Sequence, residues 1–122
     1  MLGFIAAGTA YIINKRLLKI LKPSKVSLIA PGLEELIKTF LAVYGGGNLV
    51  LVHFVFGLVE GAYDYFTARQ KLLSLFLGII THLFFGAVTL FFMVNTNLFV
   101  GIILAAAGHT LYNLLIIKFA RR

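Results

Sequence analysis

The chain has 122 residues, enough for one domain, and 61% of them are hydrophobic, with a mean hydropathy of +1.01. Charged residues make up 12%, against about 25% in a typical soluble domain. A soluble core of this size cannot bury so much apolar surface, so the composition predicts an integral membrane protein. The chain contains no cysteine, which excludes disulfides, thiol nucleophiles and thiolate metal sites.

The formal net charge of +7 comes from basic residues that gather beside apolar segments. All lysines and arginines except Lys38 fall into three clusters: Lys15, Arg16, Lys19, Lys22 and Lys25; Arg69 and Lys71; and Lys118, Arg121 and Arg122. Basic residues in such places orient a membrane protein and contact anionic lipids. We therefore expect contacts with anionic lipids at the cytoplasmic face and no binding of nucleic acid.

The apolar segments, taken in chain order, predict a single all-α domain over residues 1–122. The five expected transmembrane helices lie at about 1–14, 26–44, 48–68, 72–94 and 97–117. The first is short, and the lysines after it can complete the span by snorkelling. Residues 72–117 contain no charged residue and would be about 70 Å long as one helix, so the chain must fold back near residues 95–97.

Five spans place all three basic clusters on one side of the bundle. The loops expected on the other side, residues 45–48 and 95–97, carry no charge. Because basic residues mark the cytoplasmic side, we expect the N-terminus outside and the C-terminus in the cytoplasm. Close helix packing is also expected, because Gly57 and Gly61 form a pair of small residues one helical turn apart.

Several ionisable residues fall inside the predicted spans, where each ionised group at mid-membrane costs at least ~2.5 kcal/mol. They are Glu34, Glu35, Lys38, His53, Glu60, Asp64, His82 and His109. Counted from the cytoplasmic ends of four different helices, Glu34, Glu60, His82 and His109 reach one depth of roughly 12–15 Å. This shared depth predicts one polar site inside the membrane.

Helical spacing predicts which of these side chains meet. Glu34 and Lys38 are i,i+4 neighbours, and so are His109 and Asn113. We expect Lys38 to hold Glu34 in its charged form across this turn. The four carboxylates outnumber the one intramembrane lysine, which suits a general acid or base.

Structural interpretations of the same residues remain open at this point. The pair of Glu34 and Lys38 also suits an ion pair that joins helices. Asp64 lies near the end of its span and suits a solvated helix end. His53 lies in the outer half, away from the others, and suits a packed or hydrogen-bonded core residue. His82 and His109 could each act as hydrogen-bonded contacts between helices.

Four segments, in chain order, resemble the motifs of PrsW-type intramembrane proteases. These segments are residues 30–38 (APGLEELIK), 56–60 (FGLVE), 82–86 (HLFFG) and 109–113 (HTLYN). The PrsW type belongs to the wider superfamily of CAAX-processing and bacteriocin-processing membrane proteases. The resemblance covers residues 28–116 and identifies the chain as a minimal-length member. It implies a glutamate-dependent peptidase that cleaves membrane-anchored proteins, in the inner membrane of a prokaryotic cell.

The resemblance also implies roles for six catalytic residues. Glu34, or its neighbour Glu35, would activate a water molecule as general base, and His82 would hold that water. Glu60 would bind the water or orient a histidine.

The remaining two, His109 and Asn113, would donate hydrogen bonds to the oxyanion on the scissile carbonyl. Water must enter from the cytoplasmic side, because the lipid supplies none.

Two alternatives to a metal-free peptidase follow from the same residues. No cofactor is expected, but a divalent metal such as zinc is the alternative, with the ligands Glu34, Glu60, His82 and His109. The chain could also be a non-catalytic membrane scaffold or binding protein, or a small ion- or proton-coupled transporter, because buried acids serve such sites too. Five helices of one chain form little wall around a transport pathway, so a homo-oligomer is among the candidate assemblies.

Overall fold

The structure is a computed structural model that describes residues 1–67 and 71–120. These residues form five helices and contain no strand. The helices are α1 (Leu2–Ile20), α2 (Pro23–Tyr44), α3 (Leu49–Thr67), α4 (Lys71–Asn95) and α5 (Leu98–Ala120). Three of them, α3, α4 and residues Leu98–Ile116 of α5, are long and apolar enough to cross a membrane. The all-helical class is therefore confirmed for the described residues, and three of the helices have the length and composition of membrane spans.

The first helix is longer than the sequence predicts. It continues through the basic residues Lys15, Arg16 and Lys19 to Ile20, because lysine, arginine and leucine are good helix formers. Only residues 21–22 then link α1 to α2. The second helix begins at Pro23, three residues before the predicted start at 26, with the proline in the first turn, where it lacks no hydrogen bond. Most of the expected loop 15–25 is thus helical.

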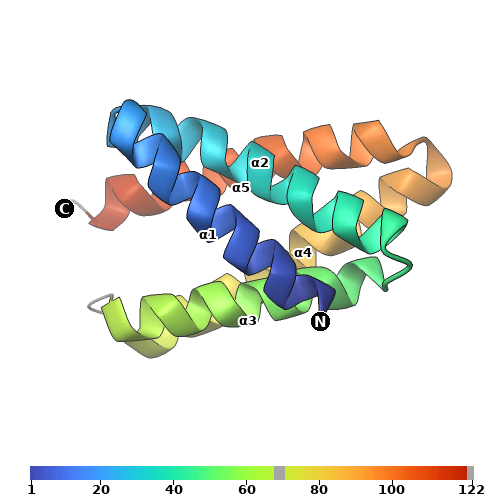
Figure 1. Ribbon diagram of the computed structural model, residues 1–122, viewed down its shortest axis with the longest axis horizontal. Coiled ribbons are helices and arrows are strands. Elements are labelled where there is room, and N and C mark those ends of the chain that lie inside the picture. The colour runs from blue at the N-terminus through green and yellow to red at the C-terminus, as the bar shows by residue number, and fades with distance from the viewer. Residues whose placement is uncertain (68–70, 121–122) are drawn as a thin grey trace.

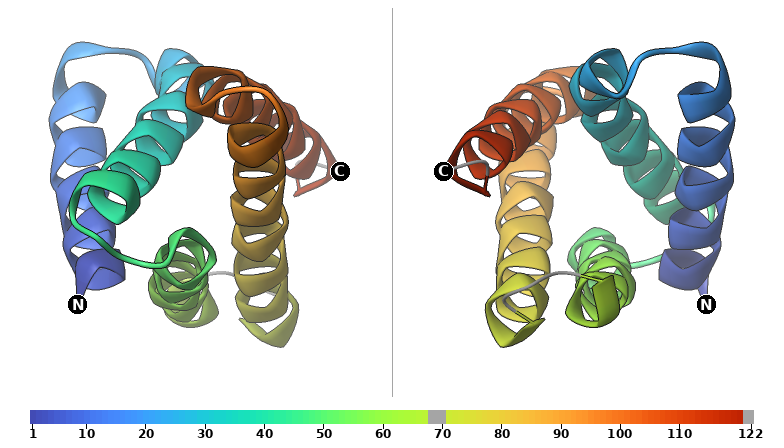
Figure 2. Two further views of the ribbon diagram at one scale, coloured as in Figure 1. Left: turned by 90° about the vertical axis from the view of Figure 1, so that its right-hand side faces the viewer. Right: turned by 90° about the vertical axis from the view of Figure 1, so that its left-hand side faces the viewer.

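Successive helices run in opposite directions along the long axis of the molecule (Figure 1). Seen along that axis, they follow one another around a ring in the order α1, α2, α5, α4 and α3 (Figure 2). Each neighbouring pair in this ring is in contact, and α2 also contacts α3 across it. This crossing of α2 brings its polar residues against α3 and α5.

Glycines permit the close approach of α3 and α4, as the sequence predicts. A Cβ atom on Gly57 would lie 2.8 Å from the carbonyl oxygen of Gly78, and one on Gly61 would lie 2.7 Å from that of Leu75. Neither approach is compatible with a larger residue at the same backbone separation. The Gly57 position would also meet the Cβ of His82 at 2.9 Å. The glycine contact therefore fixes how close His82 lies to α3.

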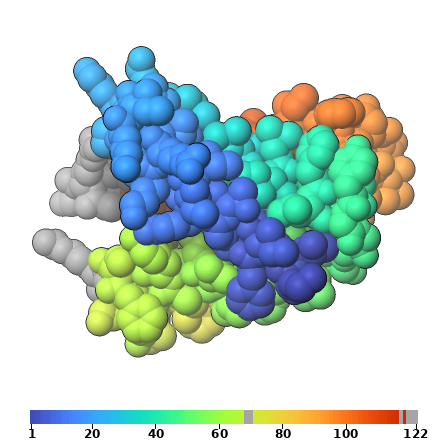
Figure 3. All heavy atoms as spheres, viewed as in Figure 1, coloured from blue at the N-terminus to red at the C-terminus, as the bar shows by residue number. Residues whose placement is uncertain are grey.

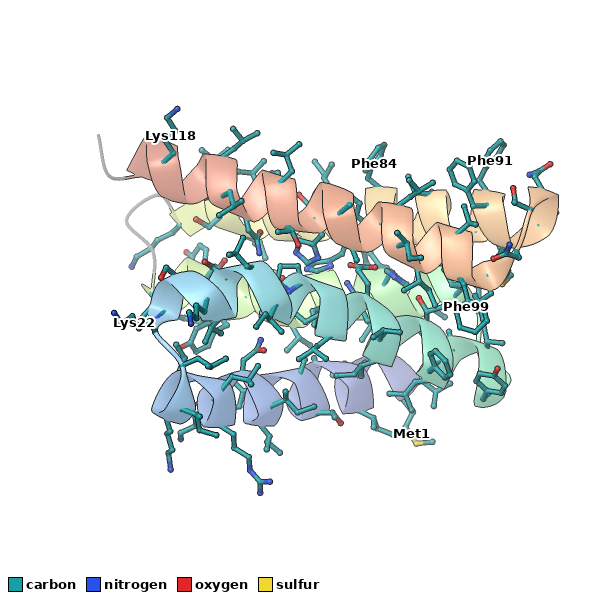
Figure 4. The ribbon with its side chains drawn as sticks, turned by 90° about the horizontal axis from the view of Figure 1, so that it is seen from above. Met1, Lys22, Phe84, Phe91, Phe99 and Lys118 are labelled. Atoms are coloured by element: carbon teal, nitrogen blue, oxygen red, sulfur yellow. The ribbon has the colours of Figure 1, made fainter. Side chains whose placement is uncertain are left out.

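The polarity of the molecule is inverted relative to a soluble protein. Large apolar side chains cover the outside, and Phe84, Phe91 and Phe99 are each 60% exposed or more (Figure 4). The largest fully buried side chains include a lysine, three histidines and a glutamate. Lys22 and Lys118 lie at one end of the bundle, and Met1 lies toward the other (Figure 4). Such an arrangement is typical of a protein that is surrounded by lipid.

Candidate functional site

The centre of the buried polar cluster is Glu35 of α2, whose side chain is fully buried. Its Oε1 accepts hydrogen bonds from Lys38 Nζ at 2.5 Å and from His109 Nδ1 at 3.0 Å. Its Oε2 lies 3.1 Å from Nε2 of His53. One carboxylate thus joins residues of α2, α3 and α5.

Lys38 extends the cluster to α4. Its ammonium group lies 2.8 Å from Nδ1 of His82, and because an ammonium only donates, this nitrogen must accept. The hydrogen of neutral His82 is therefore on Nε2, which donates to Glu60 Oε2 on α3. The tautomer of His82 is set by Lys38 on one side and Glu60 on the other. Lys38 also lies over the ring of Phe56, 4.6 Å from its centroid.

The hydrogen bonds of His53 require one further proton. The carbonyl oxygen of Leu49 only accepts, so Nδ1 of His53, 2.9 Å away, must donate to it. A proton must then also lie between His53 Nε2 and the Glu35 carboxyl oxygen, because two lone pairs do not attract. With Lys38 charged and Glu60 ionised, the connected cluster then carries no net charge. Neutrality reduces the energetic penalty of placing ionisable groups inside a membrane.

Glu34 points to a different part of the molecule. Its Oε1 accepts a hydrogen bond from Asn14 Nδ2 of α1 at 2.7 Å. Its Oε2 is buried and has no partner among the described residues. The side chain lines a cavity of about 370 Å³, whose other walls come from α1 and α3. In Figure 3 the blue atoms of α1 lie directly above the yellow-green atoms of α3.

A second, smaller cavity of about 120 Å³ lies between α3, α4 and α5. It is lined by four of the six predicted catalytic residues, Glu60, His82, His109 and Asn113. Glu60 and Asp64 line both cavities. Of the other two predicted residues, Glu34 lines only the larger cavity, and Glu35 lies between the helices and lines neither.

The predicted pairing of Lys38 with Glu34 is wrong. Lys38 pairs with Glu35, three residues before it, and Glu34 pairs with Asn14. Residues three and four apart are both neighbours on a helix, so spacing alone does not choose between the two glutamates. The choice follows from the packing of α2, which turns Glu35 and Lys38 inward and Glu34 toward α1.

The placement of His53 away from the polar site is also wrong. His53 contacts Glu35 directly, although it is hydrogen-bonded inside the core as the structural interpretation expects. A signal was available, because His53 and Glu60 are seven residues apart and share one face of α3. Asp64 is partly buried near the end of α3 and lines both cavities, which is compatible with its interpretation as a solvated helix end. Asn14 was missed, and its only signal was its position at the end of the first apolar segment.

The geometry also bears on the metal alternative. Among the described residues, the group whose ligand atoms come within 4.8 Å of one another contains Glu35, His82 and His109. It has Glu35 in place of the expected Glu34 and does not include Glu60. Lys38 Nζ already contacts Glu35 and His82 at 2.5 and 2.8 Å. A metal held by these ligands would therefore displace the ammonium group.

Comparisons with protein families, with characterised proteins and with solved structures find no match to this chain. The functional argument therefore depends on the geometry of the buried residues and on the four sequence motifs.

Aromatic stacking helps to hold His109 in the polar cluster, because the rings of Phe85 and His109 lie 5.2 Å apart and nearly parallel.

Proposed function

We propose that this protein is an intramembrane peptidase of the PrsW type, with Glu34 as its general base. The observation that carries the proposal is the buried, unpartnered Oε2 of Glu34 on a cavity beside a fully connected polar cluster. A general base needs a free lone pair within reach of water. Oε2 of Glu34 has free lone pairs while Asn14 holds the other oxygen, and the cavity that Glu34 lines would bring water to this carboxylate.

Glu35 is less suited to the role of base. Both of its oxygens already have partners, one of them the Lys38 ammonium, and its side chain lines neither cavity. We assign Glu35 a positioning role, because it holds His109 and Lys38 in place. Lys38 in turn fixes the tautomer of His82.

The proposed reaction is direct hydrolysis of a peptide bond. Glu34 takes a proton from water as the water oxygen attacks the scissile carbonyl carbon. When the carbon–nitrogen bond breaks, the protonated Glu34 returns that proton to the leaving amine. Glu60 holds the water, and His82, whose two ring nitrogens contact Lys38 and Glu60, orients the Glu60 carboxylate. This role of Glu60 agrees with its lining of both cavities.

His109 and Asn113 stabilise the oxyanion in this proposal. They lie one helical turn apart on α5 and line the same cavity. Nδ1 of His109 donates to Glu35, so Nε2 is the nitrogen left for a substrate. Asn113 supplies one donor, and His109 supplies the second when Nε2 carries a proton. Removal of one such donor typically slows a reaction by about 10²–10³-fold.

The proposal places all five helices across a prokaryotic inner membrane, with the basic end in the cytoplasm. The alternating helix directions and the positions of Lys22 and Lys118 support this orientation (Figures 1 and 4). The smaller cavity includes Ser74 at the start of α4 and Ile116 late in α5. These two residues lie toward the basic end, which is where water would enter.

The experiment is cleavage of single-span membrane peptides by the protein in liposomes. Wild type is compared with Glu34→Gln and His109→Ala, each with and without a strong chelator. Loss of cleavage in both folded variants, with no effect of the chelator, supports the glutamate mechanism. Loss of cleavage when the chelator is added would indicate that these residues bind a metal ion. A wild type that cleaves no peptide contradicts the proposal.

A second candidate function is proton-coupled transport. It is favoured by the proton that the hydrogen bonds require between His53 and Glu35. A transporter would acidify or alkalinise liposomes in a substrate-dependent way, and His53→Gln would abolish this flux. A peptidase would show no such flux. The chain as a non-catalytic scaffold would tolerate Glu34→Gln with partner binding intact.

A further inference from the structure

The larger cavity has a lining that suits one chemical class of ligand. Its walls are mostly apolar and include Ala7, Ala10, Phe56 and Val59. Its volume of about 370 Å³ is roughly twelve times the ~30 Å³ that one water occupies in the liquid. It falls at the lower end of the range of small-ligand pockets, about 300–1,000 Å³. A small, mainly apolar group therefore fits it.

The polar atoms of the cavity are nearly all acceptors. Oε2 of Glu34 and Oδ1 of Asn14 are both buried without a partner among the described residues. The carboxylates of Glu60 and Asp64 line the same cavity, and none of the described lining residues is a lysine or arginine. Buried acceptors without donors are unfavourable, because they have lost their hydrogen bonds to water without replacement. A ligand that brings donors and positive charge would remove this penalty.

Two tyrosines from facing helices extend this preference. Tyr11 and Tyr63 line the cavity, are 54% and 58% exposed, and form an edge-to-face pair with centroids 6.3 Å apart. Aromatic faces attract cations. The ammonium group of Lys15 already lies over the ring of Tyr11, 5.8 Å from its centroid. The exposed side of the cavity thus attracts a cation, as its buried side does.

We propose that this cavity binds a basic side chain, lysine or arginine, of a membrane-anchored protein, with the apolar stem along Phe56 and the charged end at Asp64 and the rings of Tyr11 and Tyr63. The inference rests on the proposed function, because the protein that carries this side chain is the substrate only if the chain is a peptidase. The basic side chain is the specificity determinant, and it places the neighbouring peptide bond beside the Glu34 carboxylate.

The test measures binding separately from cleavage. A fluorescent single-span peptide with one lysine near the end of its apolar segment is compared with two matched peptides. These carry norleucine, which keeps the stem and lacks the charge, or arginine. Binding to the protein in nanodiscs is followed by anisotropy, and cleavage of the same peptides is followed by mass spectrometry.

The lysine and arginine peptides should bind wild type at least about tenfold more tightly than the norleucine peptide. In Asp64→Asn this preference should fall, because one carboxylate of the lining is lost. Equal binding of all three peptides to wild type overturns the cation site, and this comparison requires no variant to fold. Cleavage of all three peptides at one rate overturns the cation site but agrees with the proposed peptidase. A strong basic preference without any cleavage keeps the site and contradicts the peptidase.

Discussion

The pairing of Lys38 with Glu35 can be tested by a double-mutant cycle. Both side chains are fully buried, and their charged atoms lie 2.5 Å apart. Lys38→Met leaves the Glu35 carboxylate without its ammonium partner and removes the donor to His82. Breaking one side of a buried ion pair costs about 3–5 kcal/mol. We expect a loss of that size in the free energy of unfolding, measured by titration with a denaturing detergent in mixed micelles.

The double variant Lys38→Met/Glu35→Gln should recover part of this loss. It contains neither charge of the pair, and the Gln oxygen can still accept from His109. We expect a coupling energy of about 2–3 kcal/mol between the two positions. The matched control is the cycle of Lys38→Met with Glu34→Gln, because Glu34 contacts Asn14. Its coupling should stay below about 1 kcal/mol. A larger coupling with Glu34 than with Glu35 would refute the assigned pairing.

Three further outcomes follow from the packing and the orientation. Gly57→Ala should lower the free energy of unfolding by about 1–3 kcal/mol, because its Cβ would meet His82 and Gly78. Gly32→Ala should not lower it in this way, because nothing lies within 4 Å of a Cβ at that position. Equal losses for the two variants in detergent unfolding would contradict the packing of α3 against α4. His53→Leu should cost about 1–3 kcal/mol by the same assay, because it leaves a Glu35 oxygen unpaired; no change would contradict the contact. Lys19→Cys and Thr96→Cys should react with an impermeant maleimide from opposite sides of the membrane, and reaction from one side would contradict the topology.

The sequence predicts the helices well because their signal is local. The breaks near residues 45–48 and 95–97 fall where the structure turns, at polar and glycine-containing segments. The end of α1 was misplaced because a run of lysines reads as a loop in a hydropathy pattern, although lysine forms helices readily. The contact of Gly57 with α4 was predictable because small residues one turn apart permit close packing.

The site was only partly predictable, because contacts between helices depend on their rotation and crossing. Depth along each helix was sufficient to group Glu60, His82 and His109, which line one cavity. Depth does not give the direction in which α2 faces. The division of roles between Glu34 and Glu35, only 100° apart around the helix, therefore stayed open until the packing was known. The shared face of His53 and Glu60 indicates that His53 points toward the site, but its contact with Glu35 depends on the crossing of α2 over α3, which spacing along one helix does not give.

The proposed peptidase is tested most directly by single-turnover cleavage of a membrane peptide by wild type, Glu34→Gln and Glu35→Asp, with the fold of each verified by detergent unfolding. Loss of the general base should slow Glu34→Gln by about 10²–10⁴-fold while the protein stays folded. Glu35→Asp keeps the carboxylate and should be slowed less, because it changes only the position of His109 and Lys38. Full activity in folded Glu34→Gln would contradict the proposed mechanism.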